Sequence, residues 1–434
     1  MKLMLRWFVM HGFLRFVAGR AAAAGDLQAR LIGDPAVRED PTGLFSDIRA
    51  RGPVTKGRLA AVTVDHAIVH QVLRSDDFRT IVLGSKLPGP LGAIERRTRS
   101  EALHPLRPPS LLATEPPEHT SYRKMVSSVF TARAVAAMRD NVEETARALL
   151  DDLDGAAGTV DIVERYCAKL PVTVIGDILG VPESERDKVL HFGELAAPSL
   201  DLGLPWGQFR RVEHGIERFN EWLADHLATL RRSPGDDLMS QLIAATDNGV
   251  SLTDEELRGI AGLVLAAGFE TTVNILGSGI DLLTHHPDQL ALLQEDPSLW
   301  PNAVDEMLRL RSPVQLTARS AVRPTEVGGV SFERGELIVL VLAGANRDPA
   351  VFTDPDRFDV TRANANKHHS FSGGRHFCLG AALARAETEV GLRALFDRYP
   401  DLREAGPPVR RDTRVLQGYS AMPVTLGERS SART

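Results

Sequence analysis

A glycine-rich segment near the C-terminus delivers a cysteine to the first turn of an expected helix. It comprises residues 371–380, in the order Phe-Ser-Gly-Gly-Arg-His-Phe-Cys-Leu-Gly. Backbone N–H groups and the helix dipole favour a thiolate at such a position, and His376 can donate to an anion. Gly374 and Gly380 leave room for a flat ligand against the backbone. Cys378 is therefore expected to act as a metal ligand or, paired with His376, as the nucleophile of a hydrolase.

A second unusual cluster lies inside the longest expected helix, which spans residues 254–285. Its sequence over residues 266–272 is Ala-Ala-Gly-Phe-Glu-Thr-Thr. Glycine in mid-helix costs about 1 kcal/mol relative to alanine, and adjacent threonines are also poor helix formers. A threonine hydroxyl can bond the carbonyl one turn earlier and bend the helix. We therefore expect a local distortion of functional origin, the alternative being a helix-packing glycine beside a solvated Glu270.

Both clusters resemble motifs of the cytochrome P450 family. The cysteine loop is similar to Phe-x-x-Gly-x-His-x-Cys-x-Gly, with Ser372 where the family usually has glycine, and the helix cluster is similar to Ala-Gly-x-(Asp/Glu)-Thr. The resemblance implies that Cys378 ligates the iron of haem b (iron protoporphyrin IX), where a thiolate favours O–O cleavage. It also implies that Thr271 acts in O2 activation and that Glu270 relays protons. The remaining residues expected to face the haem are Phe371, Gly374, Gly380, Ala267 and Gly268.

The two propionates of haem need cations where they are partly buried. Residues 115–123 resemble the family pattern Asp-Pro-Pro-x-His-x-x-x-Arg, with Glu115 in place of aspartate. The resemblance implies that His119 and Arg123, four residues apart on one helix face, bind the propionates. Arg319 and His376 would supply the other two cations.

Glu306 and Arg309 are three residues apart on an expected helix, which by itself is an ordinary ion-pair spacing. Their position between the long helix and the cysteine loop resembles the Glu-x-x-Arg motif of the family. By this resemblance Arg357 is the third member of a structural network that holds the fold around the cofactor.

The elements expected to position these residues are mostly helices. Helical patterns dominate from residue 121 to about residue 305, and a last helix is expected over 379–399. Short strands are expected over 62–64 and 337–342. A hairpin turn is expected at 327–330, and a C-terminal strand pair is expected over 415–425. Stretches rich in Pro and Gly, 80–112 and 197–205, are expected as loops.

The fold class is therefore mainly α with small β-sheets. The resemblance extends over about residues 40–425 and implies a single P450-like domain, with the haem between the long helix and the cysteine loop. We divide the chain into an N-terminal extension, residues 1–30, and a haem-thiolate monooxygenase domain, residues 31–434.

The extension contains an apolar segment, residues 1–20, that is interrupted by Lys2, Arg6, His11 and Arg15. A bilayer span needs about 20 apolar residues, so the segment is too short to cross a membrane, and Arg15 argues against a signal peptide. Two interpretations remain: a helix packed on the body of the protein, and a basic helix lying on a membrane surface. We favour the first.

The composition excludes two further classes. A net charge of −6 provides no basic excess to displace phosphate counterions, so nucleic acid is not an expected partner. Two cysteines among 434 residues argue against a disulfide framework and indicate the cytoplasm. Cys167, in a helical stretch, is expected to be a buried and inert thiol.

In the P450 family the substrate pocket is lined by segments that are apolar in this chain. The expected lining is Leu91, Leu200, Val264, Val314, Leu316 and Tyr419. Such a lining indicates a hydrophobic substrate, for example a polyketide, macrolide or lipid. No Gly-x-Gly-x-x-Gly motif follows an expected strand, so no flavin or nicotinamide domain is expected. The resemblance implies that electrons come from NAD(P)H through a ferredoxin and its reductase.

Three functions of different classes remain open. The first is a monooxygenase that inserts one atom of O2 into a C–H bond. A non-catalytic haem carrier or sensor would need the cysteine loop but not Glu270 and Thr271. A cysteine hydrolase using Cys378 and His376 would need no haem.

Overall fold

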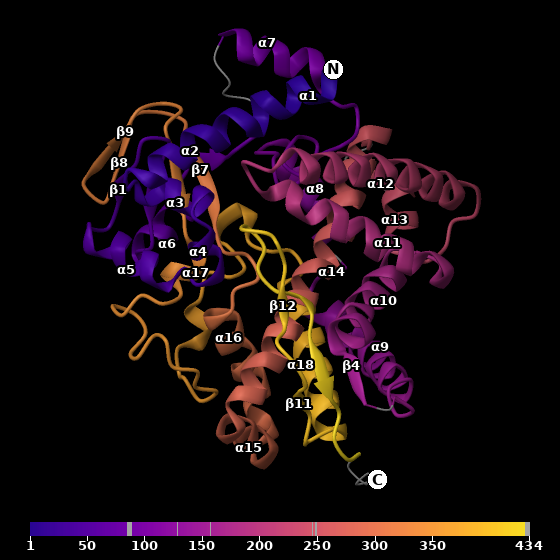
Figure 1. Cartoon of the computed structure of the whole chain (residues 1–434). Coiled ribbons are helices and arrows are strands. Elements are labelled where there is room, and N and C mark those ends of the chain that lie inside the picture. Colours follow the sequence, from indigo (N-terminus) through magenta and orange to yellow (C-terminus); the bar gives the residue numbers. More distant parts are fainter. Residues whose placement is uncertain (85–88, 128, 157, 245, 248–249, 430–434) are drawn as a thin grey trace.

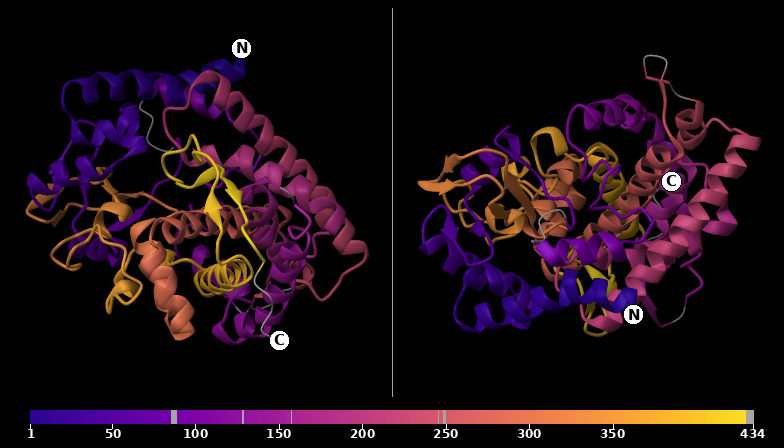
Figure 2. Two further views of the ribbon diagram at one scale, coloured as in Figure 1. Left: turned by 60° about the horizontal axis from the view of Figure 1, so that its bottom comes forward. Right: turned by 90° about the horizontal axis from the view of Figure 1, so that it is seen from above.

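The computed structural model describes residues 1–84, 89–127, 129–156, 158–244, 246–247 and 250–429 (Figure 1). A helical part and a strand-rich part lie side by side (Figure 2). The long helix α14 (Asp254–His285) runs through the helical part, where it packs against α10 and α18. Its position fixes where the two sequence clusters can meet.

The helices of the described chain, apart from α14, have the following bounds: α1 Lys2–Trp7, α2 Phe13–Ala23, α3 Leu27–Gly33, α4 Pro35–Glu39, α5 Thr42–Ala50, α6 His66–Arg74, α7 Gly89–Thr98, α8 Glu118–Ser127, α9 Ala132–Asp151, α10 Lys169–Ile178, α11 Glu183–Ala196, α12 Trp206–Arg232, α13 Leu238–Ala244, α15 Pro287–Glu295, α16 Trp300–Leu310, α17 Leu342–Ala345 and α18 Ala381–Arg398. Short π-helical turns, η1 (Phe8–Gly12) and η2 (Val163–Cys167), precede α2 and α10.

Helix α14 begins at a capping box in which Thr253 and Glu256 satisfy each other's backbone N–H groups. Most of its side chains between Leu257 and Leu283 are buried, because helices cover it on several sides. It is long and apolar enough to cross a membrane, the only such helix in the described chain. Its burial identifies it as the core helix of a folded domain.

The main sheet has five strands in the order β1-β2-β10-β7-β3. Strand β10 pairs in parallel with β2, placing Val339 opposite Val62, and antiparallel with β7, placing Ile338 opposite Arg319. This register holds Arg319 in a central strand. The strand bounds are β1 Thr55–Lys56, β2 Ala61–Thr63, β3 Phe78–Thr80, β4 Thr159–Asp161, β5 Thr246–Asp247, β6 Val250–Ser251, β7 Thr317–Ala321, β8 Thr325–Val327, β9 Val330–Phe332, β10 Leu337–Leu340, β11 Arg403–Glu404, β12 Val409–Arg410, β13 Tyr419–Ala421 and β14 Pro423–Thr425.

The mainly helical architecture with small sheets is as the sequence predicts, and the long helix has the predicted bounds. The hairpin turn at 327–330 is confirmed, since Gly328 and Gly329 both have positive φ between β8 and β9. Cys167 is fully buried, and burial raises the pKa of its thiol.

Three details of the predicted secondary structure are wrong. The expected loop at 80–112 contains helix α7, although residues 85–88 lie outside the described chain. The last two strands do not pair with each other: β13 pairs with β12, and β14 pairs with β11 and β4. Leu342 begins α17 instead of ending a strand. In each case tertiary packing decides the outcome, which local patterns do not encode.

The N-terminal segment is helical and packs on the body of the protein. Arg6 is buried and forms an ion pair with Glu213 of α12. Close packing at Gly33 joins α2 to α3, because a Cβ there would lie 3.3 Å from the carbonyl oxygen of Ala18. Helix α3 crosses residue 30, where the sequence analysis ends the extension.

Candidate functional site

One large cavity, of about 530 Å³, lies between α14, the cysteine loop and strand β7. Most of its surface is apolar. It brings together the two clusters that the sequence analysis singled out, since Cys378 and Thr271 both line it. The other predicted site residues in its lining are Glu270, Ala267, Gly268, Arg123, Arg319, Phe371, His376 and Gly380.

The cysteine loop is fixed from both sides. The backbone N–H of Cys378 donates to the carbonyl oxygen of Phe371 at 2.9 Å. The buried ring of Phe371 packs beneath the guanidinium of Arg385, whose central carbon lies 4.5 Å from the ring centroid. Ser372 has a φ of 61°, in the left-handed region where the family usually places glycine.

The two glycines of the loop serve different purposes. Gly374 has a φ of 62°, and a Cβ there would lie 2.2 Å from the carbonyl oxygen of Leu73 in α6. Its role is to let the loop approach α6, so the expectation that it makes room for a flat ligand is wrong. Gly380 does line the cavity, and no protein atom lies within 4 Å of a Cβ built there.

The side chain of Cys378 is exposed to the cavity, not to the outer surface of the protein. Burial in this apolar cavity raises the pKa of its thiol, and the backbone N–H of Gly380 and the charge of Arg123 oppose the rise. A thiolate here therefore needs a further positive charge on the cavity side, which a metal ion would supply.

On the opposite wall, helix α14 continues without interruption through the Gly-Phe-Glu-Thr-Thr cluster. The expected helix distortion is therefore absent from α14. Gly268 is required by packing instead, since a Cβ there would lie 2.7 Å from Cγ1 of Ile175 in α10. The hydroxyl of Thr271 donates to the carbonyl oxygen of Ala267 at 3.3 Å and remains within the cavity lining.

Glu270 is buried, not solvated as the alternative interpretation held. Its Oε1 lies 3.2 Å from Nη1 of Arg411, a residue just beyond strand β12. Burial raises the pKa of Glu270, and the charge of Arg411 opposes the rise. A buried carboxyl with a raised pKa can hold a proton close to Thr271.

The four predicted cations converge on the cysteine loop. Arg123 donates to the carbonyl oxygens of Phe377 at 2.8 Å and of Arg375 at 3.3 Å. The ring of His119 lies 4.5 Å from that of His376, and it is buried next to the cavity without being part of its lining. Burial, reinforced by the charges of His376 and Arg123, lowers the pKa of His119 to about 4.

Arg319 is the most deeply buried of these cations that lines the cavity. Its Nη1 donates to the hydroxyl of Thr317 and the carbonyl oxygen of Ala318, both at 2.9 Å. No carboxylate lies within ion-pair distance of it in the described ranges. Burial lowers the pKa of Arg319 to about 10, so the site favours an anionic ligand.

Glu115 moderates this positive cluster. Its carboxylate lies 3.5 Å from Nε2 of His376 and 3.2 Å from Nη1 of Arg375, and it accepts the backbone N–H of Thr80 at 2.7 Å. Burial alone would raise its pKa, but interactions with His376 and Thr80 outweigh burial and lower the pKa to about 2. Glu115 therefore stays ionised and orients the loop cations.

Glu306 and Arg309 form a fully buried, bidentate ion pair, with N–O distances of 2.7 and 2.8 Å. The third member of the network is Arg362, whose Nε lies 3.0 Å from Oε1 of Glu306. The expectation that Arg357 has this role is wrong. Its side chain is exposed, because burial of the neighbouring Phe358 turns it outward, and only its carbonyl oxygen accepts from Arg309 and Arg362.

The predicted substrate lining is partly corrected. Leu200, Val264, Val314 and Leu316 line the cavity. Leu91 does not, because it lies on α7 near the N-terminal helix. Tyr419 does not either, since its ring packs against Gly277 on α14 outside the cavity.

Sequence reasoning missed a buried carboxyl, Glu387 on α18, that lines the cavity opposite Thr272. Burial raises its pKa well above the usual range, and an interaction with Thr272 only partly opposes the rise. It also missed Asp201, which accepts the backbone N–H groups of Arg414 and Val415 at 2.9 and 2.8 Å and joins two segments of the cavity lining. Glu387 ends the run 381–387 that continues the cysteine loop, which could have pointed to it, whereas Asp201 belongs to no short motif and only the three-dimensional structure brings it into the site.

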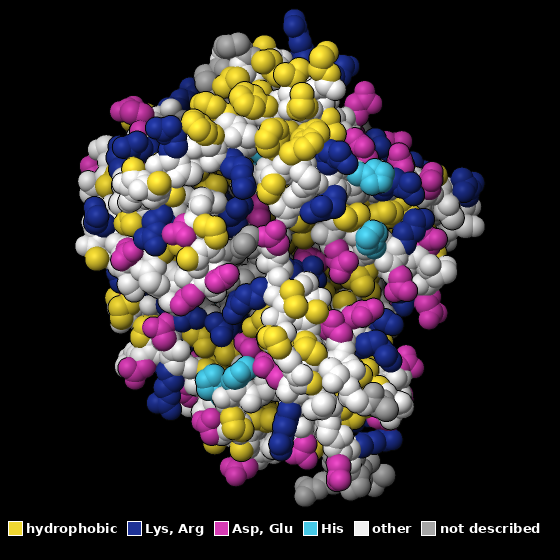
Figure 3. All heavy atoms as spheres, viewed as in Figure 1, with side chains coloured by type: hydrophobic (Ala, Val, Ile, Leu, Met, Phe, Trp, Pro, Cys, Tyr) yellow, Lys and Arg dark blue, Asp and Glu magenta, His cyan; other side chains and the backbone are white. Residues whose placement is uncertain are grey.

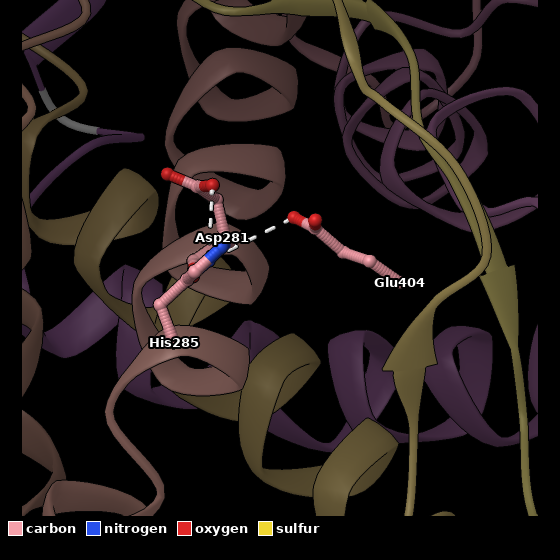
Figure 4. A group of neighbouring side chains, drawn as sticks. All are labelled: Asp281, His285 and Glu404. Atoms are coloured by element: carbon pink, nitrogen blue, oxygen red, sulfur yellow. Dashed lines mark hydrogen bonds and ion pairs between the residues drawn. The ribbon is translucent and has the colours of Figure 1, made fainter.

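Asp281, His285 and Glu404 form a separate cluster at the end of α14 (Figure 4). Nδ1 of His285 lies 2.8 Å from the carbonyl oxygen of Asp281 and 3.8 Å from Oε1 of Glu404. Arg311 also faces it, with Nη2 at 3.7 Å from Oδ2 of Asp281. The engaged ring nitrogen and the neighbouring cation indicate an ion-pair network that joins α14 to β11.

The residues of the large cavity fit a haem group. A thiol faces the cavity, a glycine beside it leaves one side clear, and a buried arginine lacks a carboxylate partner among the described residues. Thiolate and imidazole ligands suit iron, and planar guanidinium groups suit propionates. Cys378 would ligate the iron, and Arg319, Arg123 and His376 would face the propionates.

The comparisons with known proteins agree with this fit. Residues 199–402 match the family model described as Cytochrome P450. The protein named "Putative cytochrome P450 140" of Mycobacterium tuberculosis (strain ATCC 25618 / H37Rv) is 60% identical over 430 residues, 98% of each chain. The 6-deoxyerythronolide B hydroxylase of Saccharopolyspora erythraea is 43% identical over 72% of this chain and 77% of its own. The crystal structure of P450BioI in complex with hexadec-9Z-enoic acid ligated acyl carrier protein has a TM-score of 0.82 and 29% identity, and the match covers 90% of this chain and 99% of that one.

Proposed function

Because the chain belongs to the cytochrome P450 family, we propose that it inserts one oxygen atom of O2 into a C–H bond of a hydrophobic molecule. The observation that carries the proposal is the single cavity lined by both Cys378 and Thr271. Residues 31–434 would form the catalytic domain, and residues 1–30 an extension packed on it. Cys378 would be the iron ligand, with Phe371, Gly380, Ala267 and Gly268 facing the haem.

When bound, the haem supplies the redox chemistry that activates O2, which protein side chains alone do not provide. Arg123, Arg319 and His376 would hold its propionates and fix its orientation, with His119 buried beside His376 and outside the cavity lining. Arg123 also binds two carbonyl oxygens of the cysteine loop. It would thereby couple the position of the cofactor to that of Cys378.

Protons would come from the wall formed by α14. Glu270 holds a proton because burial raises its pKa, and Arg411 limits how far the pKa rises. Thr271, the next residue, presents its hydroxyl to the cavity while bonded to Ala267. In this arrangement Glu270 would deliver protons and Thr271 would position the water that carries them.

The substrate is proposed to be a large apolar molecule of the polyketide, macrolide or lipid class. Leu200, Val264, Val314 and Leu316 supply apolar contacts in the cavity. The name of one relative describes it as a hydroxylase of 6-deoxyerythronolide B, and a structural neighbour holds a fatty acid on an acyl carrier protein. The apolar lining of this cavity would suit a molecule of the polyketide or lipid class.

Electrons are proposed to pass from NAD(P)H through a ferredoxin and its reductase, in the cytoplasm. The proposed docking face surrounds the cysteine loop, where Phe377 is exposed at 42%. Lys367, Arg375 and Arg385 are the cations expected there. Arg385 is engaged by Asp305 at 2.7 Å, and Arg375 is engaged by Glu115 at 3.2 Å and by Asp76, so the exposed Lys367 is the better candidate.

The two alternative functions have less support. In a hydrolase, His376 would have to activate Cys378, but its ring lies beside His119 and Glu115, and in the described chain this ring makes no hydrogen bond to the thiol. A haem carrier or sensor would not need a buried Glu270 next to Thr271 in the cavity wall.

The proposal is tested first by the spectrum of the dithionite-reduced protein with CO. A red-shifted Soret band that is lost in Cys378→Ala supports the thiolate ligand, and its absence in the unmodified protein would disprove it. In a reconstituted system Thr271→Ala should lower product per NADPH by about tenfold or more while NADPH consumption continues. The control is Thr284→Ala, which removes a similar hydroxyl–carbonyl bond further along α14. Unchanged coupling in Thr271→Ala would reject the proton-relay assignment.

A further inference from the structure

The outer face of the N-terminal helix is apolar and exposed. Of the ten large hydrophobic side chains exposed in the described chain, six lie within the first 16 residues. We call them the N-terminal patch: Met1, Met4, Leu5, Phe8, Phe13 and Phe16. Figure 3 shows hydrophobic side chains gathered over this helix at the top of the molecule. Soluble monomers rarely expose so many apolar side chains together, so the patch indicates an interaction surface.

The helix geometry keeps these side chains on one face. Met1, Met4, Leu5 and Phe8 follow ordinary helical spacing, and Phe13, Phe16 and Arg20 resume it. The intervening gap of five residues coincides with the π-helical turn η1. Because a π-helical turn takes up one extra residue, the exposed face continues across it.

The face of the N-terminal helix opposite the patch holds the helix against the rest of the protein. Arg6 pairs with Glu213, and Nε1 of Trp7 donates to the carbonyl oxygen of Leu204 at 2.9 Å. The ring of Trp7 also packs edge-on against Trp206, with centroids 5.7 Å apart. The helix is therefore docked through one face, and the patch is a fixed property of the folded surface.

The charged side chains of the N-terminal helix itself have one sign. Residues 1–25 contain no Asp or Glu, whereas Lys2, Arg15 and Arg20 are exposed along the helix. Arg96 and Arg97 of the adjacent α7 add two further exposed cations. Two acidic residues of α12 face the helix: Glu213 is paired with Arg6, and the exposed Glu217 also lies near Arg6. A protein partner would have to match both the apolar ridge and this cationic rim, and an anionic lipid surface matches both at once.

We propose that the N-terminal patch docks the protein on the surface of an anionic phospholipid bilayer, with the phenylalanines in the headgroup region and the cations facing lipid phosphates. This attachment is peripheral, because the helix spans too few apolar residues to cross a bilayer. It does not depend on the proposed catalytic function.

A groove within the patch gives lipid a defined place to pack. It runs between α2 and the start of α12 and is lined by Trp7, Phe16, Pro205 and Trp206, with Arg15 and Arg20 at its sides. Tryptophan at the boundary of an apolar surface is typical of membrane-interface sites.

Vesicle flotation of the purified full-length holoenzyme tests the proposal. The protein should float with vesicles of phosphatidylcholine mixed with phosphatidylglycerol. The fraction of protein that floats should be lower with vesicles of pure phosphatidylcholine, and it should also fall when the salt concentration is raised from about 0.1 M to about 1 M. The double variant Phe8→Ser/Phe16→Ser should lower the partition coefficient by at least about tenfold. Both side chains are exposed, so its CO spectrum and melting temperature should match those of the unmodified protein.

The matched control is Leu292→Ser/Val409→Ser, which removes two exposed apolar side chains elsewhere and should float normally. Absence of flotation with anionic vesicles, or equal flotation of the Phe8/Phe16 variant, would overturn the proposal. A dimer in solution that dissociates in the same variant would also overturn it, since the patch would then join two copies of this chain.

Discussion

The carboxylate of Glu270 and the guanidinium of Arg411 form an ion pair between the middle of α14 and the segment after β12, with Oε1 and Nη1 3.2 Å apart. The two residues are distant in sequence, and the pair is buried beside the cavity. Arg411 thereby sets the pKa of the carboxyl next to Thr271, since its charge opposes the effect of burial.

Removal of this charge should change the pH dependence of catalysis. In Arg411→Gln the pKa of Glu270 is expected to rise further, so the carboxyl keeps its proton to higher pH. The pH profile of product per NADPH should therefore shift to higher pH than in the unmodified protein. Arg410→Gln, which changes a cation over the ring of Tyr419, is the control and should leave the profile unchanged. An unshifted profile in Arg411→Gln would show that Glu270 is not the proton donor.

Glu387 should make the protein less stable as the pH rises. Its pKa is raised in the folded state, so the unfolded chain loses this proton first and stability falls from the ordinary glutamate range toward the raised pKa. Glu387→Gln should flatten the decline in melting temperature between about pH 5 and pH 8. The exposed Glu144→Gln serves as control. An equally steep decline in Glu387→Gln would contradict the assignment.

The buried network around Glu306 contains the side chain of Arg362 and not that of Arg357, which the sequence predicted as its third member. Arg362→Leu removes a buried partner of Glu306 and should cost about 3 kcal/mol or more of unfolding free energy. Arg357→Leu changes an exposed side chain and should stay within about 0.5 kcal/mol of the unmodified protein. Urea unfolding measures both, and equal losses would contradict the network described.

Ser372 has a backbone conformation that costs a residue with a side chain about 1 kcal/mol. Ser372→Gly should relieve this strain, and once the greater entropy of glycine in the unfolded chain is subtracted, the net gain in stability should be up to about 0.5 kcal/mol. Ser372→Ala keeps a Cβ in the same conformation and should bring no gain. The test compares the melting temperatures of the unmodified protein, Ser372→Gly and Ser372→Ala. Equal melting temperatures would mean that the backbone at Ser372 is unstrained.

Much of this molecule can be predicted from local sequence. The long apolar run predicts the bounds of α14, and the glycine-rich loop predicts the cysteine that lines the cavity. The errors arise where distant segments meet. Gly374 is needed because Leu73 lies against it, and Arg362 replaces Arg357 because the chain between them turns one side chain inward and the other outward.

The same limit explains the corrected cavity lining. Leu91 and Tyr419 are apolar and lie in segments that line the pocket in this family, but each packs elsewhere here. Neither the spacing of apolar residues nor a short motif predicts which of several apolar side chains faces a cavity. Packing density and the paths of neighbouring helices decide it.

The N-terminal helix also holds a loop, residues 201–204, that lines the cavity. Trp7 donates to the carbonyl oxygen of Leu204 at 2.9 Å, and Arg15 donates to that of Gly203 at 3.2 Å. The preceding residues of this loop, Asp201 and Leu202, line the cavity. Undocking the helix would therefore remove two hydrogen bonds that hold this loop in place. If attachment of the helix to a surface changes the affinity of the cavity for a molecule, thermodynamic reciprocity requires that this molecule change the affinity of the helix for the surface by the same factor. With such coupling, binding of a molecule in the cavity and attachment of the N-terminal helix to a surface are linked equilibria.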